Sequence, residues 1–221
     1  MEFFYHESGL MLPKKVSLLP VHGAILMPRA QLPVPIFEEQ YLHLVSDAIR
    51  EDVYVGVIQP ILDDIQKSRE PLSLFSSGTL GRVTEILEIE EQRVVVNIVG
   101  VCRFDIVEQS EVTLSGRNVE VVYERYLQDL QEISEIQIDR QRLLQALDGY
   151  FRQYNVAPNW KEIDQTTDAR LIAALSMVCP FDAREKQALL EASSLELQSE
   201  MITKLIEFAN FEGVNPSMTR H

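Results

Sequence analysis

The pattern of hydrophobic and polar positions divides the chain into a β-rich first part and a helical second part. Short apolar and β-branched runs, separated by Pro, Gly and acidic residues, predict strands in the first part. The clearest signal is a hairpin within Gly78–Glu108, where Gly100 interrupts the pattern and indicates a bulge at a bend. Further strands are expected near residue 18 and at 32–36, 53–58 and 118–123. Together these strands predict a small, strongly bent barrel.

Two prolines set the strand at 32–36 apart from the others. Backbone N–H groups alternate sides along a strand, so Pro33 and Pro35 remove two successive donors from the same edge. Such a strand can pair fully on one side only. We therefore expect it at a sheet edge or at the seam of an incompletely closed barrel.

A helix is predicted directly after this strand. Glu38 and Glu39 suit its first turn, where carboxylates interact favourably with the positive end of the helix dipole. Apolar residues then recur at helical spacing. These residues are Tyr41, Leu42, Val45, Ala48 and Ile49.

From Tyr126 onward the β-branched runs stop, and Leu, Gln, Ala and Glu predominate. Amphipathic helices are expected around residues 143–154 and from Thr167 to Val178. Asp182 and Glu185 have the spacing of a capping box, which predicts another helix start. Ser193 or Ser194 can cap the last helix, with Gly213 just past its end. The chain is thus predicted to be an α+β protein, with a β-barrel in residues 1–125 and a helical bundle in 126–221.

Several motifs of the first part resemble the amino-terminal, substrate-binding domain of Lon proteases. Arg29 stands where that family commonly has Gly, and Glu39-Gln40 where it commonly has Pro-Arg. The matching motifs are Leu18-Leu19-Pro20, Leu26-Met27-Pro28, Leu32-Pro33, Ile36-Phe37-Glu38 with Tyr41, Gly78-Thr79-Leu80-Gly81-Arg82-Val83 with a turn near Glu90-Glu91, and Gly100 through Ile106. The segment from Pro180 to Glu191 resembles the helical half of stand-alone bacterial proteins of this kind.

The resemblance implies a PUA-like β pseudo-barrel and a role in binding polypeptides. It does not extend to the ATPase and protease domains of Lon, because the chain has no G-x-x-x-x-G-K-[ST] phosphate loop and no Ser-Lys dyad can be placed in it. We therefore expect a non-enzymatic protein without a cofactor. Its expected partners are exposed or unfolded polypeptide segments, with a protease or chaperone as a further partner.

Net charge and cysteine content limit the possible partners, metal sites and cellular compartment. The net charge is −14 and both parts are acidic, which argues against nucleic acid as a partner. The two cysteines, Cys102 and Cys179, lack metal-ligand spacing and are expected as buried free thiols in a cytoplasmic protein. The first residues carry no signal-peptide pattern, and no apolar run is long enough for a membrane span, so no membrane association is expected.

The predicted contact surface is the loop and strand that the family motifs share. Its candidate residues are Met27, Pro28, Arg29, Gln31, Pro33 and Pro35. Two readings of this loop stay open: an exposed apolar tip that touches other proteins, or residues that close the barrel. Two other functions are weighed against polypeptide binding. One is an adaptor that docks on a folded protease or ATPase. The other is a small hydrolase using His22 or Cys102.

Overall fold

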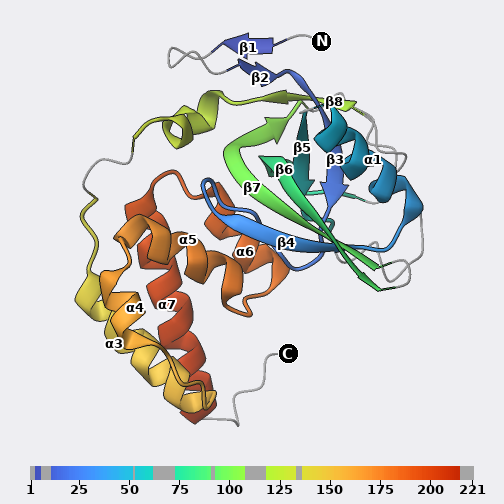
Figure 1. Cartoon of the computed structure of the whole chain (residues 1–221). Helices are drawn as coiled ribbons and strands as arrows, with labels where there is room; N and C mark the ends of the chain where they lie inside the picture. Colours follow the sequence, from blue (N-terminus) through green and yellow to red (C-terminus); the bar gives the residue numbers. More distant parts are fainter. Residues whose placement is uncertain are drawn as a thin grey trace. The chain divides into compact units, whose positions relative to one another are not determined.

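The computed structural model describes residues 3–5, 11–51, 53–61, 73–90, 93–107, 118–132 and 136–214. The chain forms two compact units (Figure 1). The first contains the residues up to Glu132 together with Asp182–Glu191, and the second contains Ile133–Phe181 together with Ala192–His221. The chain therefore crosses between the units three times.

The first unit is built on a six-stranded mixed sheet with the order β4-β7-β6-β5-β3-β8. Strand β8 pairs with β3 and also returns to β7, so the sheet closes on itself. This closure confirms the predicted α+β fold with a β pseudo-barrel. The strands are β3 (Lys15–Pro20), β4 (Gln31–Ile36), β5 (Tyr54–Ile58), β6 (Ser77–Glu90), β7 (Arg93–Ile106) and β8 (Asn118–Val122). The short strands β1 (Phe3–Tyr5) and β2 (Met11–Pro13) pair separately.

The predicted irregularity at Gly100 is a register shift between β6 and β7. Leu80 lies opposite Cys102, whereas Gly81 lies opposite Gly100, so β7 has one extra residue at this point. A Cβ atom at Gly100 would lie 2.2 Å from the carbonyl oxygen of Met27. Glycine is therefore required here because another backbone segment approaches too closely for a side chain.

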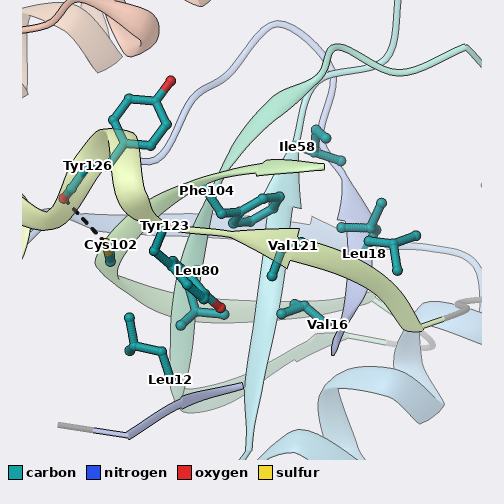
Figure 2. Close-up of a cluster of buried hydrophobic side chains, with 11 residues drawn as sticks. Leu12, Val16, Leu18, Ile58, Leu80, Cys102, Phe104, Val121, Tyr123 and Tyr126 are labelled. Carbon is teal, nitrogen blue, oxygen red and sulfur yellow. Dashed lines mark hydrogen bonds between the residues drawn. The ribbon is translucent and has the colours of Figure 1, made fainter. Parts of the chain in front are cut away.

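The barrel interior is filled by large buried side chains (Figure 2). Phe104 is fully buried, and the hydroxyl of Tyr123 donates a 2.6 Å hydrogen bond to the carbonyl of Pro13. This bond ties the end of β2 to the core. The cluster consists of Leu12, Val16, Leu18, Ile58, Leu80, Cys102, Phe104, Val119, Val121, Tyr123 and Tyr126.

The helix predicted after β4 is α1 (Glu39–Arg50). It buries Tyr41, Val45 and Ala48, as its apolar spacing predicts, and it packs on β5 and β6. Ile49 lies on the exposed side. A 3₁₀ helix, η1 (Glu124–Leu130), follows β8 and packs on β7.

Helix α6 (Ala183–Glu191) differs from the sequence expectation, which placed it with the helical bundle. The predicted capping box is present: the backbone N–H of Glu185 donates to Asp182 and that of Asp182 to Glu185, both at 2.8 Å. The helix nevertheless belongs to the first unit. Side-chain amides explain this placement. Gln187 donates to the carbonyl of Ser77, and Gln59 donates to Gln187 and to the carbonyl of Ala183.

The second unit contains α3 (Arg140–Gln153), α4 (Trp160–Gln165), α5 (Asp168–Val178) and α7 (Leu195–Val214). The hydroxyl of Ser194 accepts the N–H of Leu197 at 3.2 Å, which confirms the predicted cap. Helix α7 runs through Gly213, so the prediction that it ends before this glycine is wrong. Trp160 starts α4 and packs edge-on against Phe151 of α3.

Candidate functional site

Strand β4 is the exposed edge that its prolines predict. Among the described strands it pairs only with β7, antiparallel, with Pro33 opposite Asn97 and Pro35 opposite Val95. The side chains alternate: Val34 and its even-numbered neighbours turn inward, while Gln31, Pro33 and Pro35 are exposed. The prediction of a strand that pairs on one side only is confirmed.

At Pro33 and Pro35 the free edge of β4 offers hydrogen-bond acceptors without donors. In an antiparallel pair, the N–H and C=O of one residue point to the same side. The backbone N–H and C=O groups of the even-numbered residues of β4 point toward β7. The carbonyl oxygens of Pro33 and Pro35 therefore point away from β7. Neither proline has an N–H group. Another strand therefore cannot form a complete ladder here, but groups that donate hydrogen bonds can reach both carbonyls.

The surface formed by the exposed side chains of β4 extends across the neighbouring strands β7 and β6. Asn97 of β7 lies opposite Pro33, and its amide donates a 3.1 Å hydrogen bond to Glu85 of β6. Val95, Asn97 and Glu85 cannot be recognised as neighbours of β4 from the sequence alone, because only strand register brings them beside it. We call Gln31, Pro33, Pro35, Val95, Asn97 and Glu85 together the β4 face.

Phe37 extends the β4 face at the end of the strand. It is 65% exposed, the highest value among the large hydrophobic residues that the structure describes in the first unit. Glu38 and Glu39 follow it directly and are also exposed. An apolar ring beside carboxylates is thus presented at the point where β4 leads into α1. The sequence indicates this exposure, because Phe37 directly follows the strand at an odd-numbered position and so continues its exposed side.

Met27 does not belong to an exposed loop tip. Its side chain is only 3% exposed, between the equally buried Ile25 and Leu26 and the half-buried Pro28. The loop is held inward because Thr79 donates a 2.6 Å hydrogen bond to the carbonyl of Leu26. The reading of this loop as an apolar tip around Met27 is therefore wrong, and Met27 closes the barrel.

Pro28 and Arg29 lie at the turn that leads into β4. Pro28 forms a bridge with Gly100, and the N–H of Arg29 donates to the Gly100 carbonyl at 2.8 Å. Arg29 has a φ of +61°, in the left-handed region that favours glycine. A glycine would adopt this conformation without strain. The guanidinium of Arg29 is exposed and donates to the carbonyl of Gln131.

The residues considered for hydrolysis are not brought together as a catalytic group. Cys102 is fully buried, and burial raises the pKa of its thiol well above the usual value, which opposes formation of the thiolate. His22 is exposed on the loop before β4, and His43 lies on α1 beside Glu39. Among the described residues, no three His, Cys, Asp or Glu side chains are placed to hold a metal ion.

The second unit has a shallow groove of its own. It has a volume of about 640 Å³ and lies along α3 near Trp160 and Leu144. Its two charged lining residues have partners, since Arg140 pairs with Asp168 and Asp148 pairs with Arg152. This groove therefore presents apolar surface with neutralised charges.

Comparison with known proteins identifies the family. The model of the ATP-dependent protease La (LON) substrate-binding domain matches residues 15–207, which is most of the chain. This chain belongs to the LON substrate-binding domain family. The match is to the substrate-binding domain and not to the ATPase or protease domains of Lon. The resemblance inferred from the sequence motifs is thereby confirmed.

Lon proteases and Lon amino-terminal domains are among its relatives. Lon protease 2 of Myxococcus xanthus and the Lon protease of Anaeromyxobacter dehalogenans are each 22% identical to it over 197 residues. These matches cover 88% of this chain but only 24% and 23% of those proteases, so the chain spans about a quarter of their length.

Two solved structures share the LON-domain fold. The Lon N-terminal domain protein from Xanthomonas campestris has a TM-score of 0.59 at 20% identity, covering 86% of this chain and 97% of that one. The N-terminal domain of Mycobacterium avium complex Lon protease has a TM-score of 0.56 at 14% identity, covering 87% and 98%. None of the helices in the described ranges has both the length and the apolar character needed to cross a bilayer.

Proposed function

We propose that this LON-domain chain is a non-catalytic module that recognises exposed or unfolded segments of other polypeptides through the β4 face. The observation that carries the proposal is the exposed, half-paired edge of β4 in a member of a substrate-binding domain family. Sheet edges are a common site for peptide recognition, because backbone groups there lack partners.

The proposed contacts follow from the exposure of each candidate residue. Gln31, Pro33 and Pro35 contact the bound segment directly, and Arg29 lies at the start of the same strand. Pro28 and Met27 support the strand from the half-buried and buried sides of the loop. Phe37 adds an exposed apolar anchor at the other end.

The partner of this module is a polypeptide, and its location is the cytoplasm. The net charge of −14 favours polypeptide over nucleic acid as the partner. The match is confined to the substrate-binding domain, which supports a role without catalysis of its own. We further propose that the module works in the cytoplasm without membrane attachment, and that a protease or chaperone receives the bound polypeptide.

A binding assay with matched ligands tests this function. A permanently unfolded, labelled protein is titrated with the purified chain, and the same protein in its native fold serves as the comparison. We expect binding of the unfolded form only. Preference for the native form would instead indicate an adaptor that docks on folded partners. Failure to bind either form would contradict the proposed function.

A pair of substitutions locates the surface. Phe37→Ser removes an exposed apolar ring next to the β4 face and should weaken binding about tenfold, as loss of an apolar anchor typically does. Val122→Ser is the control, because Val122 is also exposed and lies opposite Asp105 at the other end of β7. An equal loss in both variants would place binding elsewhere.

A further inference from the structure

The free edge of β4 has a chemical polarity that restricts what it can bind. It presents the carbonyl oxygens of Pro33 and Pro35 without any neighbouring N–H from these residues. Lys and Arg side chains are the complement of such an edge, because they carry hydrogen-bond donors and no acceptor. A hydrogen-bond acceptor of the ligand, such as a backbone carbonyl, finds no N–H donor at Pro33 or Pro35.

The charges around this edge favour the same side chains. Glu38 and Glu39 are exposed at its end, next to Phe37. The Glu85 carboxylate lies on the β4 face, held by the amide of Asn97. Two cations near this face are engaged: Arg29 donates to the Gln131 carbonyl, and Arg82 donates to the Tyr54 hydroxyl at 3.2 Å and covers its ring.

Apolar surface completes the arrangement. The pyrrolidine rings of Pro33 and Pro35 are exposed, Val95 beside them is half-buried, and Phe37 is 65% exposed. Long cationic side chains can lay their methylene stems on such surface while their charged ends reach carboxylates. Apolar contact, acceptor groups and negative charge thus occur together on one face.

We propose that the β4 face selects extended polypeptide segments in which Arg or Lys alternates with apolar side chains. This inference rests on the proposed polypeptide-binding function and adds the class of segment that is bound. The Arg and Lys donors bond to the carbonyls of Pro33 and Pro35 and pair with Glu38, Glu39 and Glu85. The apolar side chains of the segment pack on the proline rings and Phe37.

Labelled peptides with identical apolar residues, carrying Lys in one and Glu in the other at the same positions, test the selectivity. We expect the Lys peptide to bind about tenfold more tightly at low salt, since its ammonium groups can pair with several exposed carboxylates that repel the Glu peptide. The difference should shrink when the ionic strength rises to about 0.5 M, because screening weakens exposed pairs.

Matched variants locate the selectivity. Glu38→Gln with Glu85→Gln removes two carboxylates from this surface and should abolish most of the preference for the Lys peptide. Glu120→Gln with Glu124→Gln is the control, because it removes the same charge at β8 and η1 and should leave the preference intact. An equal loss in both double variants would overturn the inference, since the effect would then come from the net charge.

The outcomes separate this inference from the function on which it rests. Equal binding of the two peptides, or tighter binding of the Glu peptide, would overturn the charge selectivity while leaving polypeptide binding in place. Absence of binding for both peptides and for the unfolded protein would overturn both proposals.

Discussion

The carboxylate of Asp129 on η1 accepts three hydrogen bonds from Arg103 on β7. The backbone N–H, Nε and Nη2 of Arg103 donate to it at 3.0, 2.9 and 2.8 Å. Both side chains are buried, and Arg103 also donates to the carbonyl of Leu190 on α6 and stacks on the ring of Tyr126. A single buried cation therefore joins the barrel, η1 and α6 within the first unit.

Asp129→Asn should strongly destabilise the protein. The substitution leaves the buried guanidinium of Arg103 without its countercharge, and breaking one side of a buried pair typically costs about 3–5 kcal/mol. Urea denaturation measures the change. Glu207→Gln is the control, because the Arg142–Glu207 pair is exposed to solvent and should contribute far less to stability than the buried pair. Similar small losses in both variants would show that the buried pair is not important for stability.

Met27→Asp should reduce stability rather than act on binding directly. Its side chain is 3% exposed, so the variant buries an unpaired carboxylate at a cost of several kcal/mol, on the order of the penalty for unpaired buried polar groups. Gln31→Asp, on the exposed side of β4, should stay within about 0.5 kcal/mol. Thermal melts compare the two. An unchanged melting temperature for Met27→Asp would place this side chain at the surface.

Gly100→Ala should destabilise the junction between β7 and the loop before β4. The new methyl group would lie 2.2 Å from the Met27 carbonyl oxygen, and relieving such a clash typically costs about 1–3 kcal/mol. Gly23→Asn is the control, because it tests whether replacing any glycine lowers the stability by a similar amount. Gly23 has a φ of +63° with open space around it, and Asn tolerates this conformation. We expect a smaller loss for Gly23→Asn in the same denaturation assay.

Pro33→Val combined with Pro35→Val should promote self-association while the fold is retained. Valine supplies an N–H group at both positions, which completes the donors of this edge and allows it to pair with a second chain. Size-exclusion chromatography at increasing protein concentration measures the effect. Gln31→Val on the same side of the strand adds an apolar side chain without a new donor and should stay in the wild-type state. If the double variant stays monomeric, the missing N–H donors are not what prevents β4 from pairing with a second chain.

Local chemistry made several features of this LON-domain chain predictable from the sequence. The alternate prolines remove backbone donors wherever the strand lies, so Pro33 and Pro35 were enough to place β4 at an edge. The Asp182–Glu185 capping box and the Ser194 cap depend only on groups three residues apart, and both are present. The family motifs likewise predicted the barrel and the LON substrate-binding domain family to which the chain belongs.

Features that depend on distant residues were decided by the tertiary structure. The burial of Met27 depends on Gly100 and Thr79, which approach it only when β6 and β7 have paired. The β4 face needs strand register to bring Glu85 and Asn97 beside Pro33. Helix α6 has the amphipathic pattern of a bundle helix, but Gln187 reaches Ser77 and Gln59, and its end meets Arg103. Periodicity shows that a helix buries one face but not which partner covers it, because buried polar groups must find their hydrogen bonds in three dimensions.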